Sequence, residues 1–142
     1  MRNEAMNYKK IIIILLIFVS GGARAAWLLI PMDEAQKNHL KSYGIAFWTL
    51  SRDVEVKWLL NYRGGSYMVE YAKPIEDECL IRGVTYQVIA DVQSTAILQE
   101  IADPQVNMDA IKLHKAPKVA IYSPKNKQPW DDAVTLALTY AE

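Results

Sequence analysis

Hydrophobic positions along the chain form two patterns: short uninterrupted runs, and longer stripes that recur every three or four residues. A short apolar run bounded by polar residues, glycine or proline is typical of a buried strand. These runs predict strands at residues 27–31, 56–61, 67–71, 84–89 and 118–122.

The stripes predict amphipathic helices between the strands, because residues three and four apart share one helical face. We expect these helices at residues 34–50, 75–82, 92–102 and 130–141. Asp33 is placed to cap the first of them. Gly44 lies inside the same helix, where glycine costs about 1 kcal/mol relative to alanine, so it predicts close packing against a neighbour.

Strands that alternate with helices through short connections favour an α/β fold with a mostly parallel sheet and flanking helices, Rossmann- or flavodoxin-like. The runs at 56–61 and 67–71 can also pair as a hairpin across Gly64 and Gly65. Residues 105–117 are ambiguous, and within them 108–113 predicts either a short helix or an irregular crossing. The last strand and helix have no following strand, so we expect the α/β fold to be incomplete at the C-terminus.

The N-terminal region has the pattern of a secretory signal peptide. Lys9 and Lys10 precede the apolar run Ile11–Val19, and Ala23-Arg24-Ala25 supplies small residues at the cleavage positions. The run is shorter than the roughly 20 residues of a membrane-spanning helix. An uncleaved anchor, the alternative, would need a longer apolar segment.

The predicted division is therefore a signal peptide at 1–25 and an α/β domain at 26–142. Within that domain, residues 118–142 form the opening strand and helix of a unit that we expect to continue. The protein is expected in the periplasm or outside the cell, with no stable membrane span after cleavage. Either Met1 or Met6 could be the initiator.

Composition and charge narrow the function classes. Half of the residues are hydrophobic, which favours a packed core. The whole chain is formally neutral, and removal of residues 1–25 leaves twelve basic and fifteen acidic residues, a charge of −3. A mildly acidic domain argues against general nucleic-acid binding. Cys79 is the only cysteine, so no internal disulfide can form.

The first candidate binding site is the loop that follows the predicted strand 118–122. Ligands of open α/β sheets bind where strands end and helices begin. Four polar side chains there could hold an anionic group: Ser123, Lys125, Asn126 and Lys127. An ordinary solvated loop is the alternative. The loop lacks the glycines of a nucleotide-binding loop, and the sequence predicts no cofactor.

The second candidate site is the turn containing Arg63, Gly64 and Gly65. Two glycines allow backbone amides to converge on an anion, and the Arg63 guanidinium could bind a carboxylate with two hydrogen bonds. A plain hairpin turn is the alternative. The predicted partner at either site is a small anionic or carboxylate ligand.

The residue types that usually carry catalysis or bind metals are few. His39 and His114 have no evident Cys or carboxylate partner at metal-ligand spacing, so no metal site is predicted. Cys79 follows Glu76, Asp77 and Glu78, whose charges would raise its pKa, and a buried structural role is favoured over a nucleophile. The catalytic residues therefore stay unassigned.

Four segments resemble a family of secreted bacterial proteins labelled asparagine synthetase B. They are AWLLIPMDEAQKNHLKSYGIAFW, KWLLNYRGGSY, EIADPQVNMD and APKVAIYSPKNKQPWDDAVTLALTYAE. Family members continue beyond the equivalent of Glu142, so the resemblance implies that this chain is an N-terminal portion. The family label implies ATP-dependent amidation of aspartate with glutamine as nitrogen donor. The unit from Lys118 onward resembles the opening of a class I amidotransferase-like or flavodoxin-like domain.

Three functions stay open at this point. The first is an exported domain at the front of a larger amidotransferase- or hydrolase-like enzyme whose catalytic residues lie downstream. The second is a non-enzymatic periplasmic or surface binding domain. The third is a glutamine-hydrolysing asparagine synthetase, as the family label states.

Overall fold

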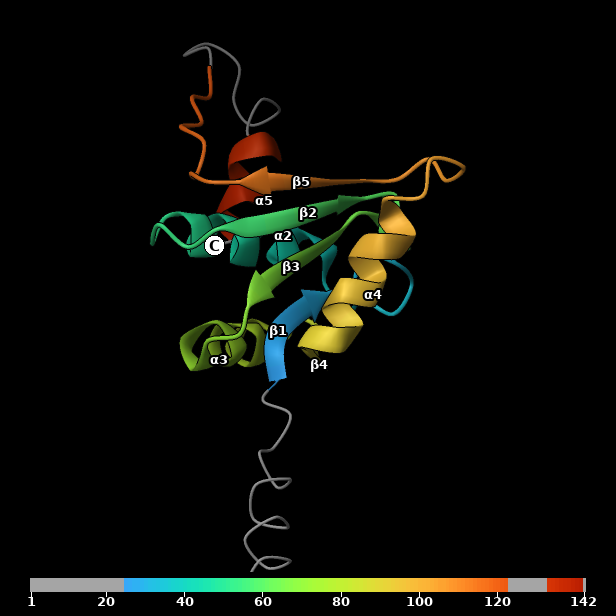
Figure 1. Cartoon of the computed structure of the whole chain (residues 1–142). Coiled ribbons are helices and arrows are strands. Elements are labelled where there is room, and N and C mark those ends of the chain that lie inside the picture. Colours follow the sequence, from blue (N-terminus) through green and yellow to red (C-terminus); the bar gives the residue numbers. More distant parts are fainter. Residues whose placement is uncertain (1–24, 123–132, 142) are drawn as a thin grey trace, which may run out of the picture.

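The structure is a computed structural model that describes residues 25–122 and 133–141 (Figure 1). Its elements follow one another as β1 (Ala25–Ile30), α2 (His39–Leu50), β2 (Val56–Leu60), the 3-10 turn η1 (Tyr62–Gly64), β3 (Ser66–Glu70), α3 (Lys73–Arg82), β4 (Gln87–Ala90), α4 (Asp91–Ile101), β5 (Asp109–Leu113) and α5 (Ala133–Ala141). The predicted signal peptide lies outside the described residues, apart from Ala25, which begins β1 and pairs with Ala90.

The five strands form one sheet in the order β4-β1-β3-β2-β5, and every neighbouring pair is antiparallel. The predicted parallel, Rossmann- or flavodoxin-like sheet is therefore wrong. The predicted hairpin is confirmed, since β2 pairs with β3 through the register Trp58 opposite Tyr67.

The error lies in what fills the space between the first two strands. β1 and β2 do run in the same direction, because each is antiparallel to β3. They are not neighbours, however, since β3 returns through the hairpin and inserts between them. β4 then pairs with the free side of β1. The order β-α-β-β-α-β with β4-β1-β3-β2 in the sheet is the split βαβ, or ferredoxin-like, arrangement.

Two further predictions fail beyond β4. Residues 108–113 form neither a short helix nor an irregular crossing, because β5 extends along the open edge of β2. Residues 118–122 are not a strand, and Val119 and Ile121 are 58% and 41% exposed. Residues 118–122 pair with no strand of the described sheet.

The helices lie close to their predicted ranges, with one exception. α2 begins at His39 rather than near residue 34, and its cap is Asn38, whose side chain accepts a hydrogen bond from the Lys41 amide at 3.1 Å. Asp33 is not the cap, because its carboxylate lies in the loop before α2 and pairs with Arg63. The part of the predicted last helix at 130–132 lies outside the described residues.

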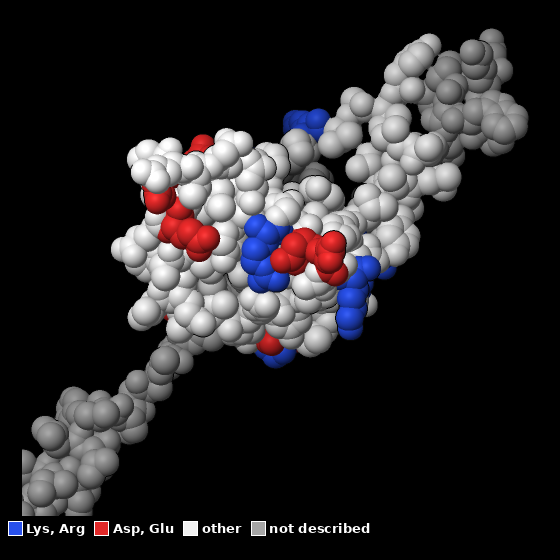
Figure 2. All heavy atoms as spheres, turned by 90° about the vertical axis from the view of Figure 1, so that its right-hand side faces the viewer, with Lys and Arg blue, Asp and Glu red and all other residues white. Residues whose placement is uncertain are grey.

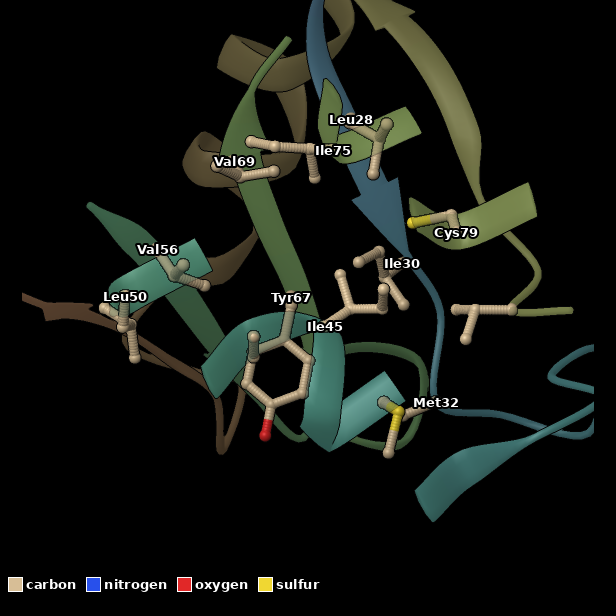
Figure 3. Packing of buried hydrophobic residues seen from close by; sticks show 12 residues of the cluster. Leu28, Ile30, Met32, Ile45, Leu50, Val56, Tyr67, Val69, Ile75 and Cys79 are labelled. Atoms are coloured by element: carbon tan, nitrogen blue, oxygen red, sulfur yellow. The ribbon is translucent and has the colours of Figure 1, made fainter. Parts of the chain in front are cut away.

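One face of the sheet packs against α2 and α3. Figure 3 shows Leu28 and Ile30 of β1 directed toward Ile45 of α2 and toward Ile75 and Cys79 of α3. Burying a side chain of this size contributes about 1.5–3 kcal/mol relative to leaving it exposed. The two helices therefore cover the sheet through one continuous apolar layer.

The opposite face is covered by α4, which crosses the sheet from the β4 end toward β5 (Figure 1). Leu29, Leu59 and Met68 are almost fully buried there and pack against Ile101. The sheet thus has a core on both faces, and α5 adds to the outer side of α2.

Candidate functional site

The turn between β2 and β3 has an unusual backbone. Asn61 and Arg63 have positive φ angles of 58° and 47°, and Gly64 and Gly65 follow with 80° and 93°. Non-glycine residues adopt this left-handed region rarely and at a cost in free energy. A side chain at Gly64 would also overlap the Met32 carbonyl oxygen, so this glycine allows the turn to approach the end of β1.

The Arg63 side chain joins three segments at this end of the sheet. Its Nε donates to Asp33 Oδ2 at 2.7 Å, and its Nη1 donates to Gln87 Oε1 at 3.2 Å. The guanidinium beside Asp33 holds the pKa of that carboxyl below its ordinary value. An external carboxylate at Arg63 would therefore compete with Asp33, which sequence reasoning had not linked to this turn.

The charge on the molecular face drawn in Figure 2 is mixed. On the face drawn in Figure 2, basic side chains lie next to acidic ones, and uncharged atoms cover most of the described surface. Ser123, Lys125, Asn126 and Lys127 lie outside the described residues. The anion-binding roles of both loops stay predictions.

Gln36 is a buried polar residue that the sequence did not single out. Its Nε2 donates to the carbonyls of Pro31 at 2.8 Å and Thr85 at 3.1 Å, while its Oε1 accepts from the amides of Asn38 and Thr85. Because unpaired buried polar groups are costly, this amide fastens the loop before α2 to the segment before β4. Its role is structural.

A second polar cluster surrounds Glu76 near the start of α3. Its carboxylate accepts hydrogen bonds from the hydroxyls of Tyr71 and Tyr86 at 2.8 Å and 3.0 Å, and it pairs with Lys73 at 3.1 Å. The Tyr71 hydrogen bond and then the Lys73 ammonium lower the pKa of Glu76, and the carboxylate in turn contributes to raised pKa values of both tyrosines. The cluster ties the start of α3 to the segment after β3 and to the segment before β4.

Cys79 is fully buried in the layer between the sheet and α3 (Figure 3). Burial raises the pKa of its thiol to about 12, with Glu76 and Glu78 contributing in the same direction. A thiolate is the reactive form of cysteine, so this side chain behaves as a small hydrophobe. The structure agrees with the structural role predicted for it.

The two histidines lie apart from each other and from Cys79. His39 is exposed at the start of α2, and His114 Nδ1 lies 3.3 Å from Glu55 Oε2 beyond the end of β5. Among residues 25–122 and 133–141, no group of three or more His, Cys, Asp or Glu side chains is arranged to hold a metal ion.

A groove of about 830 Å³ lies between α2, α5 and the segment after β5. Its walls are mostly apolar, with Tyr43, Phe47 and Trp48 on one side and Val119 and Leu138 on the other. Sequence reasoning missed this groove, because it depends on α5 packing across α2. An exposed apolar surface of this kind marks an interaction site more often than a catalytic one.

No family model, curated protein or solved structure matches this chain. Within the part of the chain that the structure describes, no helix is long and apolar enough to cross a membrane.

Proposed function

We propose that this chain is the front part of a longer exported protein of the family labelled asparagine synthetase B. In this proposal residues 26–113 form an accessory domain, and residues 118–142 belong to a second unit. Amidotransferase- or hydrolase-like catalytic residues belong to the segments that follow. The resemblance of four long segments supports the family, and the signal pattern of residues 1–25 supports export.

The observation that carries the proposal is the surface of α5. α5 contains no charged residue, and Val134 and Leu136 are 56% and 65% exposed. Large apolar side chains exposed together on one helix normally mark a surface that another segment covers. The neighbouring segment is also apolar and exposed, with Tyr122 at 88%. Both surfaces fit burial by further strands and helices of a second unit.

The proposal is tested by extending the chain with the codons that follow Glu142 in its gene. The extended protein should unfold at a clearly higher urea concentration and should lose the self-association expected of the shorter chain. The matched control is the extended protein carrying Leu136→Ser, which should lose most of the gain. A shorter chain that is monomeric and gains nothing from extension would contradict the proposal.

Export is tested separately by intact mass of the protein recovered from the envelope of a bacterial host. We expect cleavage after Ala25 and a new N-terminus at Ala26. A soluble cytoplasmic form that retains residues 1–25 would contradict export without affecting the second-unit proposal.

The activity stated by the family label is tested with aspartate, glutamine and ATP. Position 2 is Arg2 instead of the nucleophilic cysteine of glutamine-using asparagine synthetases, and the sequence has no Ser-Gly-Gly-x-Asp loop for ATP. We therefore expect no asparagine formation by this chain. Asparagine formation that survives Cys79→Ser would overturn that expectation.

A binding domain without catalysis is the second candidate, and the apolar groove between α2 and α5 favours it. Its volume of about 830 Å³ lies within the range of small-molecule sites. If the groove binds a ligand in the longer protein, Phe47→Asp should abolish binding of an apolar fluorescent probe. If the second unit fills the groove, the extended protein should not bind the probe at all.

A further inference from the structure

The last turn of α5 is held against α2 by a contact that only glycine permits. Ala141 is buried, and its carbonyl oxygen lies where the Cβ of any other residue at position 44 would be. The close packing that Gly44 predicted is therefore a backbone contact between two helices. No larger residue fits at position 44 unless the Ala141 backbone moves, and Ala141 itself is buried.

Arg82 provides a second contact to the same turn. Its Nη1 donates to the Ala141 carbonyl at 3.3 Å, and its Nε is held by Glu78 at 2.9 Å. Only 13% of the Arg82 side chain is exposed. The last carbonyls of a helix have no partner within the helix and carry partial negative charge, so a fixed cation there is favourable.

Two residues at the start of α2 provide a third contact. The Asn38 side-chain amide donates to the Tyr140 hydroxyl at 2.7 Å, and the Lys41 ammonium lies 5.0 Å from the centre of the Tyr140 ring. By contrast, the first turns of α5 expose Val134 and Leu136. The specific contacts therefore concentrate at the C-terminal turn.

We infer that Gly44, Arg82 and Asn38 form a docking site for the C-terminal turn of an uncharged helix, and that this site fixes α5 and the unit to which it belongs on the front domain. That α5 belongs to a second unit rests on the proposed function. The docking site itself does not depend on it. The site selects a helix whose last turn carries a small residue beside Gly44 and a tyrosine beside Asn38. The two units then move as one body.

Hydrogen exchange of the whole chain tests the inference, because Gly44→Ala has opposite expected effects on the two helices. Alanine favours the helical backbone more than glycine, so exchange in α2 should slow or stay unchanged. The overlap with Ala141 should speed exchange of the α5 amides by about tenfold or more. Unchanged exchange in α5 would overturn the inference.

Two further variants separate docking from a general loss of stability. Ala141→Leu alters α5 alone and should speed α5 exchange as strongly as Gly44→Ala. Arg82→Gln should speed it by about two- to fivefold, since the cation at the helix end and its hydrogen bond to the Ala141 carbonyl are lost. The control Arg52→Gln removes an arginine of the segment after α2 that stacks on Trp48 and does not contact α5. The inference would be overturned if these variants speeded hydrogen exchange equally in the sheet and in α5. It would also be overturned if Arg52→Gln speeded exchange in α5 as strongly as they do.

The outcome does not depend on whether the chain continues. Loss of α5 docking in the variants supports the docking site even if extension of the gene changes nothing. Stabilisation by extension with unchanged α5 exchange in the variants would support the second unit and reject the docking site.

Discussion

Apolar segments of similar sequence are buried in the sheet region, residues 25–113, and largely exposed in the α5 region, which comprises residues 118–122 and α5. In β1, the residues Leu28, Leu29 and Ile30 are nearly all buried, because helices cover both faces of the sheet. In residues 118–122 and in α5, apolar residues of the same kinds are largely exposed. An apolar pattern thus specifies how a segment can pack, while its burial depends on partners supplied elsewhere in the chain.

The difference also shows where specific contacts accumulate. The sheet region is closed by Gln36, by the Glu76 cluster and by the Asp33–Arg63 pair, whereas the described contacts of α5 concentrate at one turn. The first region is therefore expected to carry most of the free energy of unfolding.

The largest expected effect compares two leucines of equal size. Leu59 is fully buried and Leu136 is 65% exposed. Leu59→Ala should lower the free energy of unfolding by about 2–5 kcal/mol through lost burial and a cavity. Leu136→Ala should change it by less than about 0.5 kcal/mol. Urea unfolding measures both, and equal effects would erase the distinction between the two regions.

A smaller effect is expected from the buried amide that closes the sheet region. Gln36→Ala leaves the amide and carbonyl of Thr85 without their partner, which should cost about 1–3 kcal/mol. Gln99→Ala on the exposed side of α4 is the matched control and should be nearly neutral. A loss no larger than that of the control would show that water replaces the Gln36 amide.

A pH effect should also distinguish the sheet region. The pKa of Glu76 lies below its ordinary value of 4.5 in the folded chain, so its stabilising contribution is present above that pH. It is lost as the pH falls through the lower, folded value. The unfolding midpoint should therefore decline between about pH 5 and pH 2, and less steeply in Glu76→Gln. Glu34→Gln, an exposed control, should retain the slope of the wild type.

The last prediction concerns the reactivity of the Cys79 thiol rather than a change in stability. With a pKa of about 12, Cys79 should react negligibly with iodoacetamide near pH 8 in the folded chain. It should react readily in urea, and mass spectrometry can follow the labelling. Rapid labelling without urea would mean that α3 separates from the sheet under native conditions.

Local patterns predicted most of the elements but not how the strands are ordered. Four predicted strands and all four helices appear near their expected residues, since each depends on periodicity within one short segment. Parallel pairing of β1 and β2 failed because the sequence of those strands does not reveal that β3 inserts between them. The relevant information is shared among three segments.

The edge of the sheet beside β2 is a second place where the local sequence pattern did not predict strand pairing. Residues 109–113 contain charged positions and looked irregular, yet they pair with β2 because its edge is open to them. Residues 118–122 have the stronger strand pattern and stay unpaired in the described sheet. The strand propensity of a segment therefore decides its structure less than whether a neighbouring strand is available to pair with it.

The candidate site was predicted in part. The turn expected at Arg63, Gly64 and Gly65 is confirmed, whereas the anion-binding role predicted for it stays a prediction. The partner Asp33 lies thirty positions earlier in the sequence. The contact forms because β1 ends at the same end of the sheet as the turn between β2 and β3. Gln36 gave no signal, because a glutamine in a polar stretch looks the same whether it is exposed or buried.

The first residue of β1 links the order in which the protein is processed to the order in which it folds. Ala25 pairs with Ala90, and the predicted signal peptidase cut directly follows Ala25. A protease needs an accessible substrate, and in the folded but uncleaved chain the same bond lies within β1. If the chain is exported as proposed, cleavage must come before β4 joins β1. A chain that folds before translocation would then keep its leader, so maturation itself would report when folding took place.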